Sequence, residues 1–356
     1  MDSLTQIALG SAVSVAVMGR RTAVWKAALW GAVAGTLPDL DAFIDHGNAV
    51  LNMVKHRAES HSLLYLTLAA PLLAAVAARV HGEAGLFKRW WLALWLALFT
   101  HPLLDTMTVY GTQLLQPFTD YPYGVGSIFI IDPAYTLPLL AGIAAALAWR
   151  ARGLQVNALG LLLSTAYLAW SFGAQQHVER LARASLQDQS LAGVSASSVQ
   201  GLLVTPAPFN TVLWRLVAHT PTHYFEGYYS LLDDNTRIEW TAHARGADLL
   251  AQHSQNPWVQ HITRFSHGFF RLSETGEKNE KGENRLFITD LRMGVEGAYT
   301  FRFDLGSQAE RAASGGRPVA PRLSSQRPDV AAALPWLWQR LKGNELPAPV
   351  FDAARS

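Results

Sequence analysis

The sequence contains no cysteine, and this absence narrows the chemistry available to the protein. Without thiols the chain offers no disulfide framework, no thiolate metal site and no cysteine nucleophile. Any bound metal ion would therefore depend on histidine and carboxylate ligands.

Charged residues are also scarce. They make up 16% of the 356 residues, whereas 50% are hydrophobic and the mean hydropathy is +0.11. This composition is too apolar for an ordinary soluble enzyme of this length and favours a membrane protein. The formal net charge is only +2 and the basic residues form no long run, so no nucleic acid partner is expected.

The apolar residues are concentrated in six blocks in the first half of the chain. The blocks are Leu4–Gly19, Val24–Leu37, Ser62–Val80, Trp90–Val109, Pro133–Trp149 and Leu154–Ala174. A membrane-spanning helix needs about 20 apolar residues, so the last four blocks qualify, while the first two are short and could be tilted, re-entrant or buried. We predict a mainly α membrane helical bundle of about six helices over residues 1–174, with the first helix retained rather than cleaved as a signal peptide.

From residue 175 the chain becomes polar, with short runs of aromatic and β-branched residues. The stretches FNTVLWRLVA, THYFEGYYSLL, RIEWTAHA, RLFITDLRMG and AYTFRFDLG have the composition of β-strands. The charged stretch ETGEKNEKGEN, residues 274–284, is typical of a solvated hairpin loop. We predict a small β-rich C-terminal domain over residues 175–310. Residues 311–356 are predicted to hold the rest of an irregular connector that begins near Ala309, and a short amphipathic helix around Val330–Leu341.

Charges alternate between the two sides of the predicted bundle. The connections after the first, third and fifth blocks carry one acid, Glu83, and these basic residues: Arg20, Arg21, Lys26, Arg79, Lys88, Arg89, Arg150 and Arg152. The other side carries only Lys55 and Arg57 against these acids: Asp2, Asp39, Asp41, Asp45, Glu59, Asp105, Asp120 and Asp132. By the positive-inside rule the basic connections are cytoplasmic, so the acidic side, both termini and the β-rich domain are predicted to be extracytoplasmic.

Three clusters of potential metal ligands fall on the acidic side. In chain order their residues are Asp39, Asp41, His56, His61, His101 and Asp105. His101 and Asp105 are four residues apart and share a helix face, a common way to offer nitrogen and oxygen ligands to one ion. An extended or turn segment after Pro38 would place both aspartates of LPDLDAFID on one side. The two histidines of HRAESHSLL are five apart and do not align, so the first is expected to approach from the preceding loop.

Each cluster also has an ordinary structural explanation. A histidine at a helix start is usually a cap or interfacial residue, acids after a proline commonly form a turn or an N-cap, and His101 could simply bond to Asp105. Uncompensated buried carboxylates, however, are costly, and divalent cations remove that cost. Because three distant clusters meet at one predicted depth, we favour a metal site.

The ligand types indicate the metal and its chemistry. Imidazole with carboxylate suits Zn²⁺, with Mn²⁺ and Fe²⁺ as alternatives, and six candidate ligands suggest two or more ions. Such a centre activates water for phosphoester hydrolysis, although amide hydrolysis uses it too. Arg57 could bind the phosphate or anchor the chain at the headgroups. Glu59 could be a general base, a further ligand or a solvent-facing acid.

Five motifs occur in order along residues 1–150: MDSLTQIALGSAV, WGAVAGTLPDLD, HRAESHSLL, THPLLDTMTVYGTQLLQPF and IFIIDPAYTLPLL. Together they resemble the YdjM/DUF457 family of inner-membrane proteins, which is labelled as metal-dependent hydrolases. PFNTVLWRLV, HYFEGYYS and TDLRMG resemble the C-terminal extension of its longer members. The family is more remotely similar to zinc-dependent phospholipase C and P1-type nucleases, which implies a helical scaffold and phosphodiester chemistry.

The resemblance extends to the candidate ligands. It matches Asp39 and Asp41 to the family pattern PDxD. It matches the histidines of HRAESHSLL to HRGx[ST]HS, and His101 with Asp105 to HxxLD. Gln6 stands where many members have histidine, which would remove one ligand.

The sequence therefore predicts a multi-pass metal-dependent hydrolase of the bacterial inner membrane, with its site on the extracytoplasmic side. A membrane lipid phosphoester is the expected substrate, because the site is predicted to lie at headgroup depth. The alternative is a non-enzymatic protein in which the same side chains hold a structural or transported ion. The aromatics of YFEGYYS are expected in a domain core, and the histidines after His177, including His219 and His223, are expected to be structural.

Overall fold

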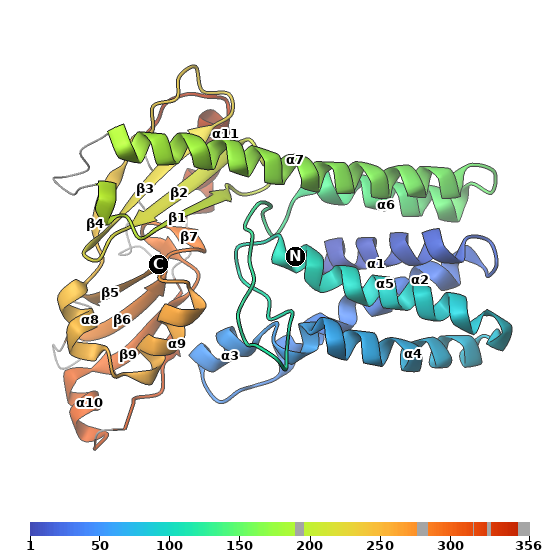
Figure 1. The fold of residues 1–356 in the computed structure, drawn as a ribbon, viewed down its shortest axis with the longest axis horizontal. Helices are drawn as coiled ribbons and strands as arrows, with labels where there is room; N and C mark the ends of the chain where they lie inside the picture. The colour runs from blue at the N-terminus through green and yellow to red at the C-terminus, as the bar shows by residue number, and fades with distance from the viewer. Residues whose placement is uncertain (189–195, 276–283, 316, 326–328, 348–356) are drawn as a thin grey trace. The chain divides into compact units, whose positions relative to one another are not determined.

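The computed structural model describes residues 1–188, 196–275, 284–315, 317–325 and 329–347. Within these residues a helical first part is followed by a part containing β-sheets, as predicted (Figure 1). The chain divides into two compact units. The helical unit comprises residues 1–44, 55–173 and 208–211, and the sheet unit comprises residues 45–54, 174–207 and 212–356.

Each of the six apolar blocks forms a helix. These are α1 (Ser3–Met18), α2 (Val24–Thr36), α4 (Leu63–Val80), α5 (Phe87–Thr106), α6 (Pro133–Ala148) and α7 (Gly153–Asp188). The shorter elements between them in the chain are η1 (Leu37–Phe43), η2 (Glu59–His61) and η3 (Ala84–Leu86), together with α3 (Ala49–Lys55), of which residues 49–54 belong to the sheet unit. α7 continues past the predicted end at Ala174, because Val178 and Ala182 pack with strand residues in a core of the sheet unit.

Among the described residues, two helices are long and apolar enough to cross a membrane, Leu63–Val80 in α4 and Gly153–Gln187 in α7. α1 and α6 are apolar but shorter. A bundle of six crossings therefore remains a prediction.

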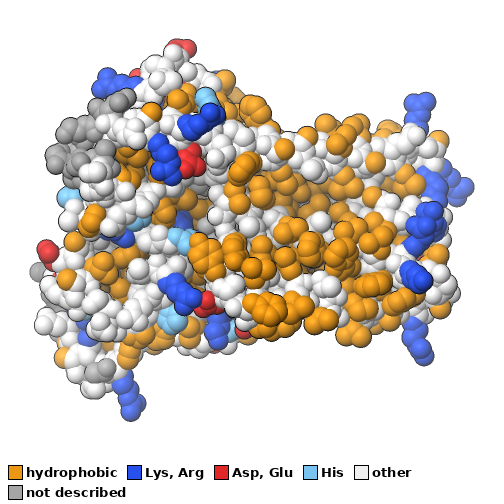
Figure 2. Space-filling model, viewed as in Figure 1, with side chains coloured by type: hydrophobic (Ala, Val, Ile, Leu, Met, Phe, Trp, Pro, Cys, Tyr) orange, Lys and Arg blue, Asp and Glu red, His pale blue; other side chains and the backbone are white. Residues whose placement is uncertain are grey.

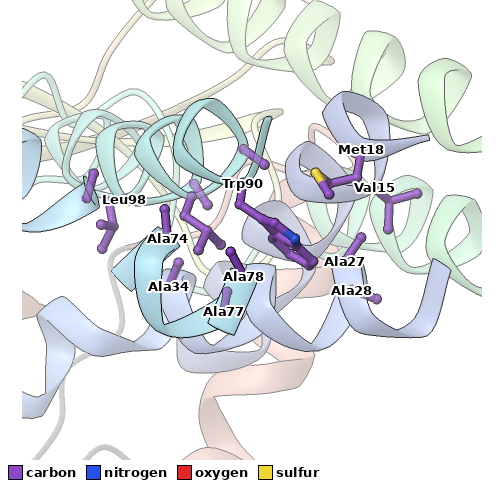
Figure 3. Packing of buried hydrophobic residues seen from close by; sticks show 14 of the residues in the cluster. Val15, Met18, Ala27, Ala28, Ala34, Ala74, Ala77, Ala78, Trp90 and Leu98 are labelled. Atoms are coloured by element: carbon purple, nitrogen blue, oxygen red, sulfur yellow. The ribbon is translucent and has the colours of Figure 1, made fainter. Parts of the chain in front are cut away.

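Small residues allow the helices to pack closely. The indole of Trp90 on α5 is fully buried, and alanines of α2 and α4 belong to the same core cluster (Figure 3). Glycines bring α1 and α2 into backbone contact: a Cβ added at Gly31 would lie 2.3 Å from the carbonyl oxygen of Gly10. One added at Gly35 would lie 2.4 Å from that of Gln6. Gly31 and Gly35 are four apart, the spacing of small residues at membrane helix contacts, and the contact fixes the point from which η1 leaves α2.

The ends of the helices in this unit differ in charge. The α1–α2, α4–α5 and α6–α7 connections lie at one end of the helical unit, and lysine and arginine gather there (Figures 1 and 2). η1, η2 and the last turn of α5 lie at the opposite ends of their helices. The basic residues and the predicted ligands thus occupy opposite ends of the bundle.

The sheet unit contains two four-stranded antiparallel sheets, of order β1-β2-β3-β4 and β10-β9-β6-β5, and a two-stranded β7-β8 sheet. The strands of the first are β1 (Gly201–Pro206), β2 (Leu213–His219), β3 (His223–Ser230) and β4 (Thr241–Ala244). The others are β5 (Phe270–Thr275), β6 (Arg285–Asp290), β7 (Gly294–Val295), β8 (Ala298–Tyr299), β9 (Arg302–Ser307) and β10 (Arg322–Leu323). Its further helices are η4 (Ala196–Ser198), α8 (Ala247–His253), α9 (Pro257–Phe265), α10 (Gln308–Ala313) and α11 (Val330–Leu341).

The predicted strands compare closely with the observed ones. Each of the five predicted stretches contains a strand, and α11 has the predicted bounds Val330–Leu341. β5 and β6 pair antiparallel around the predicted hairpin loop, of which residues 276–283 lie outside the described residues. The connector expected from Ala309 instead begins with α10, because Ser307 and Glu310 form a capping box.

The aromatic strand YFEGYYS lies in the core of the sheet unit, as expected. Tyr224 to Ser230 are buried along β3, and Glu226 is paired with Arg215 of β2 at 3.0 Å. Burial and the nearby guanidinium of Arg245 lower the pKa of His219 to about 4, so that imidazole is neutral at neutral pH.

The glycine contact predicts a large effect of one substitution. Gly31→Val would force the backbones of α1 and α2 apart and should lower the free energy of unfolding by about 1–3 kcal/mol. Denaturation of the detergent-solubilised protein measures this change. The control is Gly173→Ala, since a Cβ at Gly173 meets no atom within 4 Å. Equal stability of Gly31→Val and the parent protein would contradict the close contact.

Candidate metal centre

Four of the six predicted ligands come together in the helical unit. They are Asp39 of η1, His61 of η2, and His101 and Asp105 of α5. One ligand atom from each lies within 4.8 Å of all the others. Three segments that are distant in sequence therefore meet at one point, which we call the four-atom group.

Five of the six distances within the four-atom group resemble the edges of a small tetrahedron. Nε2 of His61 lies 3.1 Å from Nε2 of His101 and 3.2 Å from Oδ2 of Asp105. Oδ1 of Asp39 lies 3.4 Å from both imidazole Nε2 atoms, and Oδ2 of Asp105 lies 3.4 Å from Nε2 of His101. A tetrahedral zinc ion with bonds of about 2.0–2.1 Å separates its ligand atoms by about 3.3–3.4 Å. The donor atoms therefore fit a single ion of this size.

The hydrogen bonds of the imidazoles leave both Nε2 atoms free to bind a cation. Nδ1 of His101 lies 2.7 Å from the carbonyl oxygen of Gly35, which can only accept, so Nδ1 carries the proton. The hydroxyl of Ser60 donates to Oδ2 of Asp41 at 2.5 Å and hence accepts from Nδ1 of His61 at 2.8 Å. Two nitrogen lone pairs therefore face two carboxylate oxygens. Positive charge relieves this repulsion. Arg57 and the α-amino group of Met1 supply part of it at Asp105, and a proton on one imidazole or a metal ion shared by all four atoms would supply more.

The carboxylate of Asp105 also lies where positive charge stabilises it. Its Oδ1 accepts from the amide of Gln6 at 3.0 Å and contacts the α-amino group of Met1. Its Oδ2 is buried and has no hydrogen-bond partner among the described residues. Oδ2 also lies 3.3 Å from Nε of Arg57, so a guanidinium balances part of its charge. Its distances of 3.2 and 3.4 Å to the two imidazole nitrogens are compatible with a metal ligand.

Asp41 and His56 lie beside the four-atom group and outside it. Nδ1 of His56 is 2.8 Å from Oδ1 of Asp41. Oδ2 of Asp41 accepts from the backbone N–H of Arg57 at 2.8 Å as well as from Ser60. Asp41 thus orients His61 through the serine hydroxyl. An extended or turn segment after Pro38 was expected to place Asp39 and Asp41 on one side, and that placement is wrong. η1 is a 3₁₀-helix, in which positions two apart point in different directions.

Arg57 and Glu59, the two predicted catalytic residues, have different surroundings. Arg57 is buried, its Nε lies 3.3 Å from Oδ2 of Asp105, and its guanidinium lies 5.1 Å from the centre of the Tyr110 ring. Its φ of 63° is left-handed, a conformation that a side chain other than glycine adopts at a cost. Glu59 is exposed, and its carboxylate has no hydrogen bond among the described residues.

Access to the four-atom group is uneven. The side chain of Asp39 is 17% exposed, whereas those of the other three ligands are fully buried. A molecule reaching the group would therefore meet Asp39 first.

A second group of potential ligands lies in the sheet unit, and sequence reasoning missed it. It comprises Glu226, His243 and Glu296. Arg215 lies 3.0 Å from Glu226 and Arg271 lies 2.8 Å from Glu296, so arginines already neutralise both carboxylates. The group is explained as an ion-pair network of the core, and its wide sequence separation gave no local signal.

Comparison with known proteins identifies the family. The family described as YdjM inner membrane protein matches residues 1–178. The chain is similar to the uncharacterized protein YfhP of Bacillus subtilis, at 26% identity over 250 residues that cover 67% of this chain and 72% of YfhP. It is also similar to the inner membrane protein YbcI of Escherichia coli, at 37% identity over 93 residues that cover 25% of this chain and 53% of YbcI. No solved structure matches the chain.

The family match covers half of the chain and includes every residue of the four-atom group. The membrane location expected from the composition is thereby confirmed, and the chain belongs to the YdjM inner membrane protein family.

Proposed function

We propose that this protein is a membrane-bound metal-dependent hydrolase that cleaves a phosphoester at the four-atom group. The observation that carries the proposal is the meeting of two imidazole nitrogens and two carboxylate oxygens, in which each nitrogen lies 3.1–3.4 Å from the other nitrogen and from both oxygens. A divalent ion bound there, Zn²⁺ first and Mn²⁺ or Fe²⁺ as alternatives, supplies a Lewis acid that polarises a phosphoryl oxygen.

The surrounding side chains support phosphoester chemistry. Arg57 brings a buried guanidinium to the edge of the group, where it can pair with phosphate oxygens. Glu59 is the candidate base that takes a proton from the attacking water. A second ion, expected from the number of candidate ligands, would use Asp41 and His56, which must give up their 2.8 Å contact to admit it.

The surface of the helical unit supports a location within lipid. Every fourth residue along α4 is a large exposed apolar side chain: Leu64, Leu68, Leu72, Val76 and Val80. Hydrophobic side chains cover much of the visible face of the helices (Figure 2). A water-facing helix rarely carries such a stripe, whereas a lipid-facing helix does. We propose that the basic connections face the cytoplasm and that the four-atom group lies on the extracytoplasmic side.

A metal ion that only holds the helices together is the second candidate, and the number of ligands favours it. Four protein ligands fill a tetrahedral sphere, as in structural zinc sites, whereas catalytic sites usually keep one position open. Release of Asp39, the exposed ligand, would open that position for substrate. The two functions therefore differ in whether bound metal is accompanied by turnover.

Metal content tests the site itself. We expect the purified protein to hold at least one divalent ion per chain by elemental analysis, and His61→Ala and Asp105→Asn to lose it. The control His177→Ala removes an exposed imidazole of α7 and should retain the ion. Chelation should lower the stability of the parent protein by about 4 kcal/mol if the ion is present at about a thousand times its Kd. Full metal content in both ligand variants would refute the site.

Turnover tests the enzyme. Arg57→Ala should lower kcat/KM for bis(p-nitrophenyl) phosphate by about 100-fold, the size of effect seen when one charge-stabilising group is lost, while metal content stays unchanged. Glu59→Gln should lower kcat if Glu59 is the base, and Arg152→Ala, at the basic end, should have no effect. A metal-loaded protein that hydrolyses no ester on a broad panel would favour the structural ion.

Sidedness is testable because the chain has no cysteine. Single cysteines at two exposed positions, Asp120→Cys and Arg152→Cys, report the acidic and basic sides. In intact spheroplasts a membrane-impermeant maleimide should label the first, and the second only after permeabilisation. The reverse pattern would invert the proposed topology.

A further inference from the structure

η1 carries metal-binding side chains and an exposed apolar row on different faces. A 3₁₀-helix has three residues per turn, so residues three apart lie in one row. Leu37, Leu40 and Phe43 form such a row and are 38%, 48% and 86% exposed. Asp41, in the next row, is 8% exposed and points toward the ligands. The segment therefore separates a polar interior from an apolar exterior within seven residues.

The apolar row continues a stripe on α2. Trp25, Leu29 and Val33 are exposed at every fourth residue of that helix. The 13 residues of α2 rise about 20 Å, and the seven of η1 rise about 14 Å. Their sum is close to the hydrocarbon thickness of a bilayer, about 30 Å. The stripe thus extends from the basic end of the helices to the four-atom group.

We propose that this row, with the stripe that continues it, binds the acyl chain of a glycerophospholipid whose phosphoester is cleaved at the four-atom group. The proposed lipid contact is inferred from the exposed apolar residues of α2 and η1. The proposed cleavage of that lipid rests on the function proposed above. Asp39 lies on the same segment and is the accessible ligand. A lipid lying along the row therefore brings its phosphate to Asp39 and the buried guanidinium of Arg57.

The chemistry of the stripe selects lipid over a second copy of the chain. Its six side chains carry no charge and only one hydrogen-bonding group, the indole of Trp25. Protein interfaces surround an apolar centre with a polar rim that fixes their orientation. A surface of this length without such groups matches acyl chains, which need no fixed orientation.

Spin labels test the lipid contact without reference to activity. Single nitroxide labels at Leu40→Cys and Phe43→Cys, in the full chain in phosphatidylethanolamine and phosphatidylglycerol vesicles, should collide more with oxygen than with a water-soluble nickel chelate. The control Glu59→Cys, an exposed polar position nearby, should show the reverse. Preference for the nickel chelate at the two row positions would overturn the proposal. Exclusion of both reagents would also overturn it and would indicate a second copy on the row.

A second variant tests the substrate. Leu40→Gln should lower kcat/KM for phosphatidylglycerol in vesicles about tenfold, as expected when one leucine contact is lost, and leave bis(p-nitrophenyl) phosphate hydrolysis and metal content within twofold. Leu68→Gln, on the α4 stripe, is the matched control and should change neither. Equal losses on both substrates, or none on the lipid, would overturn the assignment. If the metal-loaded parent protein cleaves neither substrate, the proposed hydrolase fails, and the spin labels alone decide the lipid contact.

Discussion

The structure around the four-atom group depends on the electrostatic repulsion among its four ligand atoms, which lie close together and largely buried. Two imidazole nitrogens and two carboxylate oxygens face one another, and three of the four side chains are closed to solvent. Little water reaches these atoms, so positive charge must relieve the repulsion, and Arg57 beside Asp105 supplies part of it. Neighbouring residues keep the Nε2 lone pairs directed inward. The carbonyl of Gly35 accepts from Nδ1–H of His101 and the hydroxyl of Ser60 accepts from Nδ1–H of His61, while the amide of Gln6 donates to Oδ1 of Asp105. The group is organised for a positive charge at its centre.

Much of this arrangement could be predicted from local pattern. The four-residue spacing of His101 and Asp105 predicts that they share a helix face, and the lengths of the apolar blocks predict the positions of the helices. The distinction between Asp39 and Asp41 could not be predicted, since it depends on whether the chain after Pro38 is extended or 3₁₀-helical. In the observed conformation one carboxylate joins the four-atom group and the other supports it. Two residues of one type, two positions apart, thus acquire different tasks.

Longer-range features had no sequence signal. The proton on Nδ1 of His101 is fixed by the backbone carbonyl of Gly35 in α2, and a backbone oxygen leaves no side-chain signal in the sequence. The group of Glu226, His243 and Glu296 combines two strands that pair in the folded sheet, β3 and β4, with the turn between β7 and β8. α7 was expected to end with its apolar run, yet its polar second half continues because one face of it packs against strands. In each case tertiary packing decides what a local pattern leaves open.

The close contact of α1 with α2 has a consequence for biogenesis. Gly35 touches the backbone of α1 at Gln6, and its own carbonyl orients His101. The ligand atoms therefore reach their positions only after α1, α2 and α5 have packed together. Before that packing, the four-atom group is not assembled. Under the proposed function, an ion would therefore bind only after this docking.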